Sequence, residues 1–348
     1  VGVKMSASLS EDECVRFTQN YFDLLKVEGK QGERAADIIN RLGKERVQQE
    51  LNKSLDEKLQ EEIIKCETKL GETETDKKTI LRIRATCGEV TSNQARKIAE
   101  ISEKYGKGFI HFPVRGDPEI PGIDKEDIGS IKKELEKVNL QILDRGIDNI
   151  QTCFGDYCTN TACDTQSLLR KIDKQIEKIG IDNFNIKISG AGCPNSCGIA
   201  HLNDIGFMGV VDPEIDTEKC NGCGLCERVC REKAIQIITP AQGVAGRIAV
   251  IDKTKCKYCG DCIRSCPVDA ISEKRKGFTV LVGGKEGEDT RLGEVIAEFV
   301  SEDEALQITE KCLKVLKEKN VNVSTIIDEV GLEKFKEMLG ICDHGPVS

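Results

Sequence analysis

Residues 220–230 read CNGCGLCERVC, and residues 256–267 read CKYCGDCIRSCP. Both segments place their cysteines in the pattern C-x2-C-x2-C-x3-C, and Pro267 follows the second pattern. A chain with two such runs typically binds two [4Fe–4S] clusters, and the fourth cysteine of each run binds the cluster held by the other run. Zinc sites instead combine separated C-x2-C pairs with local ligands. The doubled run therefore predicts a ferredoxin module through which electrons pass.

The predicted module uses all eight of its cysteines as cluster ligands. Gly222, Gly224 and Gly260 lie beside these cysteines and leave backbone N–H groups free to approach the sulfur atoms. Arg231 stands where the usual motif has proline. The motif assigns Cys220, Cys223, Cys226 and Cys266 to cluster one, and Cys256, Cys259, Cys262 and Cys230 to cluster two.

Composition indicates a metalloprotein of a reducing compartment. The chain has 348 residues, a net charge of −9 and 18 cysteines. Disulfide scaffolds are usually short and rich in loops, whereas this chain is long and has charged helical ends. The sequence has no basic stripe of the kind that indicates nucleic-acid binding. It also has no apolar run of about 18 residues, which a membrane span would need. Residues 1–10 lack the pattern of a signal peptide, so we expect a soluble cytoplasmic protein.

Hydrophobic periodicity predicts an α+β chain that begins with a helical extension. Residues 8–70 show helical spacing, including Asp37–Leu42 and Leu51–Ile64. Further helices are expected at Thr91–Lys104, Ile128–Val138, Asp164–Ile179 and from Ser301 onward. Strands are expected at Thr79–Ala85, Gly108–Val114, Leu140–Leu143, Phe184–Ser189 and Phe278–Val282. The expected domains are a helical region (1–75), a ferredoxin-like half-domain (76–146), a cluster-binding domain (147–212 and 274–348) and an inserted ferredoxin domain (213–273).

A second group of cysteines lies outside the module. Cys153, Cys158 and Cys163 precede a predicted helix, and Cys193 and Cys197 belong to the turn GCPNSCG at residues 192–198. These residues offer at least four thiolates, which is enough for a third [4Fe–4S] cluster.

This second group resembles the siroheme-containing nitrite and sulfite reductases, whose pattern is C-x5-C followed by GCPN-x-C. The resemblance extends over residues 79–293. It is strongest for dissimilatory sulfite reductase subunits and for the C subunit of anaerobic sulfite reductases, which also insert a two-cluster ferredoxin. It implies one siroheme-reductase repeat, built from a ferredoxin-like half-domain and an α/β cluster-binding domain. Its third cluster would be bound by Cys153, Cys158, Cys193 and Cys197, with Cys163 as the alternative to Cys158.

The resemblance also implies cofactor-binding roles. In the family the last cysteine, here Cys197, also bridges to the siroheme iron. The segment with Arg82 and Arg84 is similar to the strand whose arginine faces siroheme. Arg115 and Lys285 stand in two further segments of familial type. Because siroheme carries many carboxylates, such a site needs cations, and arginine grips carboxylates bidentately.

The substrate site is implied in the same way. Arg84 and Lys187 match two of the four cations that the family uses to bind sulfite. Asp148 and Asn185 stand where the family has an arginine and a lysine.

The implied function is that of the siroheme and iron–sulfur subunit of a sulfite reductase, which reduces sulfite to sulfide with electrons relayed through the ferredoxin module. Assimilatory enzymes fuse two repeats, so we expect an oligomer of this chain with itself or with a related subunit. No Gly-rich dinucleotide fingerprint is present, so an electron-donor protein or subunit is expected as well. Two alternatives remain: reduction of nitrite or a similar small oxyanion, and a non-catalytic electron-transfer subunit, which Asp148 and Asn185 favour.

Overall fold

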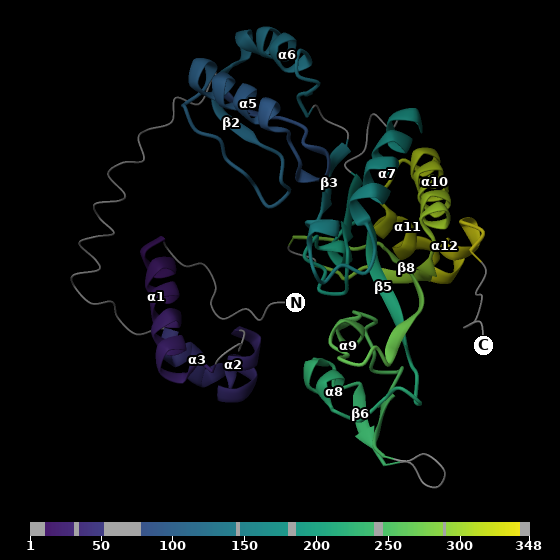
Figure 1. The fold of residues 1–348 in the computed structure, drawn as a ribbon. Coiled ribbons are helices and arrows are strands. Elements are labelled where there is room, and N and C mark those ends of the chain that lie inside the picture. Colours follow the sequence, from purple (N-terminus) through teal and green to yellow (C-terminus); the bar gives the residue numbers. More distant parts are fainter. Residues whose placement is uncertain are drawn as a thin grey trace. The chain divides into compact units, whose positions relative to one another are not determined.

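The computed structural model divides into two compact units, residues 1–76 and 77–348 (Figure 1). The described residues of the first unit form three helices, which enclose a small core formed by Leu24, Ile38, Val47 and Leu51. The predicted helix Leu51–Ile64 lies outside the described residues after Leu51. These helices are α1 (Glu11–Glu28), α2 (Ala35–Leu42) and α3 (Lys44–Leu51). The described residues are 11–30, 35–51, 78–143, 147–179, 186–239, 246–287 and 290–341.

The second unit begins with a small α+β layer. Strand β1 pairs antiparallel with β2, and helix α5 packs on β2 and on α6. Leu81 and Ile83 are buried in the core of this layer, while Arg82 and Arg84 stay half-buried on the opposite face. The alternation predicted for this segment is therefore confirmed. The elements are β1 (Lys78–Arg82), α5 (Ser92–Tyr105), β2 (Glu119–Asp124) and α6 (Ile128–Glu136).

Two strands predicted for this layer were wrong. Gly108–Val114 contains only one isolated bridge, between His111 and Glu119. Pro113 has no N–H to donate, and Phe109, Phe112 and Val114 face solvent, so a paired strand is not stabilised there. Leu140–Leu143 likewise contains only the bridge between Ile142 and Ile83.

A five-stranded sheet with the order β3-β4-β5-β8-β9 organises the rest of the second unit. Strands β3, β4 and β5 are parallel, and β8 and β9 run antiparallel to their neighbours. Helix α7 packs against β3, β4 and β5, and α10 packs against α7 and β8 (Figure 1). The bounds are β3 (Ile147–Thr152), α7 (Thr165–Ile179), β4 (Ile186–Ala191), β5 (Ile205–Ile215), β8 (Ile271–Val282), β9 (Glu294–Val300), α10 (Glu302–Lys319), α11 (Val323–Val330) and α12 (Leu332–Met338).

The cysteine-rich segment grows from the end of the two longest strands. Strands β5 and β8 pair from Ile205 with Val282 as far as Ile215 with Ile271, and the chain between them folds around its own core. That core combines cysteines with aliphatic side chains such as Ile235. The elements of this segment are α8 (Leu225–Val229), β6 (Ile235–Ile238), β7 (Ile248–Ile251) and α9 (Asp261–Arg264).

Helices α5 and α10 begin at capping boxes. The Thr91 hydroxyl accepts a hydrogen bond from the Gln94 N–H (3.3 Å), and the Gln94 side chain accepts one from the Thr91 N–H (2.8 Å). Ser301 and Glu304 repeat this arrangement at α10. Because the first N–H groups of a helix have no partner within it, these side chains fix where both helices start. Among the described residues, no helix is both long and apolar enough to span a membrane.

Candidate functional site

The second cysteine group gathers at one edge of the five-stranded sheet. Strands β3 and β4 are parallel, so their carboxyl ends meet at the same edge; Cys153 directly follows β3 and Cys193 closely follows β4. The Cys153 N–H donates to the Gly190 carbonyl (3.1 Å), and the Gly192 N–H donates to the Cys153 sulfur (3.1 Å). Parallel pairing thus brings together thiols that are far apart in the sequence.

Cys158 and Cys197 lie near the same two thiols. Burial is the largest cause of the raised pKa of Cys193, and repulsion from the Cys153, Cys197 and Cys158 thiolates adds to it. Cys197 is exposed, whereas Cys193 is buried. Cys153, Cys158 and Cys197 therefore lie close enough to Cys193 to interact with it, and the Cys197 side chain is exposed.

Cys163 makes different contacts. Its sulfur lies 3.1 Å from the Gly277 carbonyl oxygen and 3.9 Å from that of Val210, so the thiol can donate to the backbone of β5 and β8. Burial raises its pKa, which favours the protonated form that such a donor needs.

The GCPNSCG turn is tightly constrained. Ser196 and Ile199 adopt left-handed φ values of 51° and 57°, which is uncommon for residues with a side chain. The Ser196 hydroxyl and His201 Nδ1 lie 2.9 Å apart, which gives His201 a structural role in the turn. A Cβ on Gly198 would lie 1.9 Å from the Gly190 oxygen and 3.0 Å from the Cys153 nitrogen. Only glycine can therefore occupy position 198 without displacing Cys153.

Cys87 also adopts a left-handed backbone conformation. Its φ of 62° is uncommon for a residue with a side chain. Its side chain is buried in the core under the sheet, and burial raises the pKa of the thiol to about 12.

The eight cysteines of the inserted segment form two separate groups. The first lines a small cavity and comprises Cys220, Cys223, Cys226 and Cys266. The second lines a larger cleft and comprises Cys230, Cys256, Cys259 and Cys262. In each group, three cysteines come from one run and the fourth comes from the other run.

Backbone N–H groups point at several of these sulfur atoms. Ala249 donates to Cys220 (3.4 Å) and Ala270 to Cys266 (3.2 Å) in the first group. In the second group Ala234 donates to Cys230 (3.2 Å) and Tyr258 to Cys256 (3.4 Å). Such bonds stabilise thiolates and tune the potential of iron–sulfur clusters. Within the described residues, no three His, Cys, Asp or Glu side chains are grouped closely enough to hold a metal ion.

The predicted substrate and siroheme cations are mostly paired with carboxylates. Arg82 pairs with Glu119 (2.7 Å), and Lys187 Nζ lies 3.4 Å from a Glu286 oxygen. Arg115 lies in the loop between α5 and β2. The remaining predicted residue, Lys285, lies in the β8–β9 connection, where its backbone pairs with that of Arg291.

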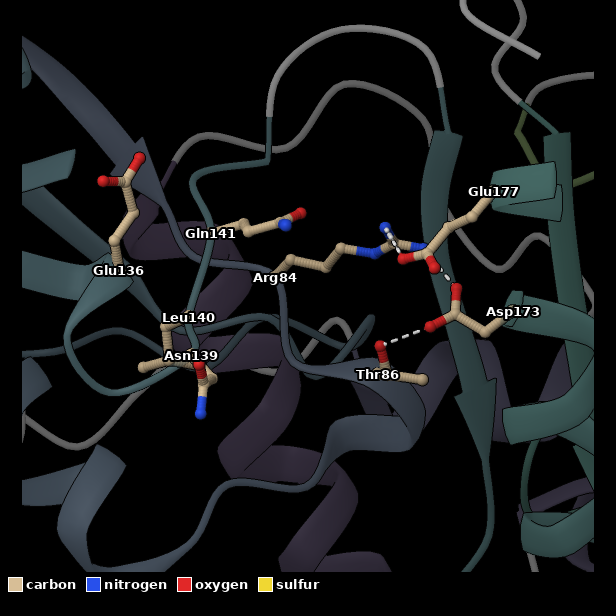
Figure 2. A pocket seen from close by; sticks show the side chains of 8 residues that line it. All are labelled: Arg84, Thr86, Glu136, Asn139, Leu140, Gln141, Asp173 and Glu177. Atoms are coloured by element: carbon tan, nitrogen blue, oxygen red, sulfur yellow. Dashed lines mark hydrogen bonds and ion pairs between the residues drawn. The ribbon is translucent and has the colours of Figure 1, made fainter. Parts of the chain in front are cut away.

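Arg84 reaches from the end of β1 to helix α7. It pairs with Asp173 and lies 3.7 Å from Glu177, and the Thr86 hydroxyl donates to the second Asp173 oxygen (2.8 Å). Figure 2 shows the guanidinium pointing at these two carboxylates in a pocket also lined by Glu136. Sequence reasoning missed Asp173 and Glu177, because a carboxylate on an amphipathic helix normally indicates a solvated face. The side chain of Asp148, and Asn185 altogether, lie outside what the structure describes.

Two family models match the chain. The model of the nitrite and sulphite reductase 4Fe-4S domain matches residues 144–342, and that of the nitrite/sulfite reductase ferredoxin-like half domain matches residues 72–138. The chain belongs to the nitrite and sulphite reductase family.

Curated members of this family are similar over most of the chain. The coenzyme F420-dependent sulfite reductase of Methanocaldococcus jannaschii is 32% identical over 74% of this chain, which spans 41% of that protein. The C subunit of the anaerobic sulfite reductase of Salmonella typhimurium is 29% identical over 74% of this chain and 82% of its own length. A ferredoxin–nitrite reductase of Leptolyngbya laminosa is 33% identical, but over 38% of this chain.

A solved structure shows the same fold. Dissimilatory sulfite reductase I superposes with a TM-score of 0.61 at 16% identity, covering 98% of this chain and 91% of that one. The α+β architecture with a ferredoxin-like half-domain and a cluster-binding domain is therefore confirmed.

The first prediction concerns the turn at Gly198. Gly198→Ala should displace the Cys153 backbone and lower the iron bound per chain, because the added Cβ meets the Gly190 carbonyl. Gly129→Ala is the matched control, since a Cβ at this site on α6 meets nothing within 4 Å. Iron analysis and absorption spectra of both variants provide the measurement. Full iron content in Gly198→Ala would show that the turn does not hold a cluster.

Proposed function

We propose that this chain is the siroheme and iron–sulfur subunit of a sulfite reductase, which reduces sulfite to sulfide with electrons supplied through its ferredoxin module. One observation carries the proposal: four thiols lie together where β3 and β4 end, and Pro194 and Asn195 of their turn line the same cleft as four cysteines of the inserted segment. The names of the relatives that match most of this chain support sulfite as the substrate. Residue 197 gives the site an exposed thiol to which a second cofactor can attach.

The proposed cofactors include three [4Fe–4S] clusters. Cluster one and cluster two correspond to the two cysteine groups of the inserted segment, and their N–H···S bonds support thiolate ligation. The third, which we call the reductase cluster, would use Cys153, Cys158, Cys193 and Cys197. The contacts of Cys163 with backbone carbonyls favour Cys158 over Cys163 as its ligand.

The residues around Cys197 suit a large amphiphilic macrocycle. Phe154 and Tyr157 are largely exposed beside the cysteines, with their rings 5.3 Å apart. In the loop between α5 and β2, exposed Phe112 lies three residues before Arg115, so this loop also carries an apolar and a cationic side chain. Siroheme would provide the iron that binds sulfite, and Arg82, Arg84, Arg115 and Lys285 would hold its carboxylates while Lys187 and Arg84 hold the substrate.

The arginines must change partners for this role. Arg84 and Arg82 are neutralised by Asp173 and Glu119, so an incoming carboxylate of the cofactor would replace a protein carboxylate. Exchange of one charge-assisted bond for another costs little, whereas an unpaired buried guanidinium would cost much more. Arg84 therefore keeps a charged partner until the cofactor binds.

Partners follow from the relatives. The Salmonella relative is by its name one of several subunits of a sulfite reductase, so we propose that this chain also works with an electron-donor protein or subunit and with a second reductase repeat. Cluster one has an exposed ligand, Cys223, at which a donor can approach. Reduced cysteines in such number are typical of cytoplasmic proteins, so we propose a cytoplasmic location.

Two other functions have specific support. Reduction of nitrite is supported by the likeness to ferredoxin–nitrite reductase over part of the chain. A non-catalytic electron-transfer role is supported by the carboxylate partners of Arg84 and Lys187, which weaken the attraction of an anionic substrate.

The second prediction separates the cluster systems. Cys197→Ser should lose the reductase cluster and the siroheme absorption, because one thiol serves both cofactors. Cys223→Ser is the matched variant in the module and should lose iron from cluster one while siroheme absorption stays. Visible spectra and iron content are measured on anaerobically purified protein. Normal siroheme absorption and sulfite turnover in Cys197→Ser would contradict the proposed function.

The third prediction tests the substrate site. Glu286→Gln should lower the KM for sulfite by about threefold, because Lys187 would no longer face a competing negative charge at a half-exposed site. Glu333→Gln, which removes a surface carboxylate paired with Lys336 on α12, should leave the KM unchanged. Equal KM values in the wild type and both variants would exclude Lys187 from the substrate site.

A further inference from the structure

Five side chains form a closed ring of contacts between the sheet and the inserted segment. Three of them lie on the sheet: Asp212 on β5, Arg275 on β8 and Phe299 on β9. The other two lie in the inserted segment, where Lys253 precedes the second cysteine run and Tyr258 belongs to it. We call these five residues the Asp212 clamp.

The ionic part of the clamp is centred on a buried carboxylate. Asp212 is 7% exposed, and its two oxygens contact different cations: Lys253 on one side and Arg275 Nε, at 3.5 Å, on the other. Lys253 also donates to the Pro213 carbonyl (2.6 Å). A buried carboxylate that lost its cations would be left with an uncompensated charge, so these contacts resist separation of the loop from the sheet.

The aromatic part closes the ring. The Tyr258 and Phe299 rings lie 4.9 Å apart at 80°, in an edge-to-face arrangement. The Arg275 guanidinium lies 4.1 Å from the centre of the Phe299 ring, and Lys253 Nζ lies 5.9 Å from that of Tyr258. Each cation therefore contacts both Asp212 and one of the rings, which couples the two parts.

Backbone strain is concentrated at the two aromatic residues. Tyr258 and Phe299 have left-handed φ values of 57° and 55°. Bulky residues adopt this conformation only where the surrounding structure holds them, and such residues cluster at functional sites. The strain falls on the two residues whose rings meet across the junction.

The clamp lies beside the GCPNSCG turn and beside the cleft that Cys230, Cys256, Cys259 and Cys262 line. Tyr258 stands between Cys256 and Cys259, and its carbonyl accepts a hydrogen bond from the Val211 N–H (2.9 Å). Pro194 and Asn195 line the same cleft as these cysteines. The Asn195 side chain also contacts Arg231 of the module (3.3 Å). The cavity of the first group shares none of these turn residues.

We propose that the Asp212 clamp fixes the distance between cluster two and the reductase cluster, and that cluster two is the neighbour of the reductase cluster. The inference rests on the three cluster sites of the proposed function. The five residues of the clamp are positioning residues, since they act through the loop that carries Cys256 and Cys259. Cluster one then lies on the side of the module where the exposed Cys223 faces a donor.

Asp212→Asn tests the clamp in the full chain with its cofactors bound. It removes the central charge and keeps the shape of the side chain. Electron paramagnetic resonance of dithionite-reduced protein should show loss of the magnetic interaction between reduced cluster two and the reduced reductase cluster. The iron content should be unchanged. Hydrogen exchange at Val211 should become faster. Glu214→Gln is the control, because Glu214 and Lys274 form an exposed pair (3.9 Å) on the same two strands.

A second variant guards against misfolding. Arg275→Gln removes the half-exposed cation of the clamp and should reduce the magnetic interaction as Asp212→Asn does. A wild-type interaction and wild-type exchange in both variants would overturn the clamp while leaving the proposed function intact. Fewer than three clusters in the wild-type protein would instead contradict the proposed function.

Discussion

The antiparallel pairing of β5 with β8 is the contact on which the second unit depends. Strand β5 is the central strand of the five-stranded sheet and β8 is its neighbour, and the far ends of these two strands carry the inserted segment. Because backbone hydrogen bonds continue without a loop from the sheet into the module, the module cannot turn freely about a linker. Parallel pairing of β3 and β4 then places the second cysteine group at the sheet edge. The two pairings together decide where every proposed cluster site lies relative to the sheet.

Charge follows a consistent pattern across these sites. Thiolates, a polyanionic cofactor and an oxyanion substrate all need positive partners or N–H donors, and burying any of them without such partners is costly. The structure supplies backbone N–H groups to the cysteines and keeps its arginines paired with carboxylates. The same use of paired charge secures the module, where Asp212 contacts Lys253 and Arg275. We propose that the carboxylate partners of Arg82 and Arg84 are replaced when the cofactor binds, whereas the ion pairs of Asp212 remain in place.

Sequence reasoning recovered the elements with strong local signals. The spacing of the ferredoxin cysteines predicted two groups that each borrow one cysteine from the other run, and the periodicity of residues 165–179 predicted helix α7. It failed at Gly108–Val114, where Phe109, Phe112 and Val114 are exposed although the run looked like a strand, and it missed β2, β3, β5, β6, β7 and β9. Long-range pairs such as Arg84 with Asp173 leave no local pattern, because their partners are chosen by packing of separate layers. The clamp was invisible for the same reason, since its five residues come from four segments.

Iron and siroheme content of the anaerobically purified chain test the central claim most directly. Three clusters and one siroheme predict about thirteen iron atoms per chain together with a siroheme absorption band. A value near eight iron atoms (two clusters) without that band would leave the ferredoxin module intact and contradict the assignment of the chain as a siroheme-bearing reductase subunit.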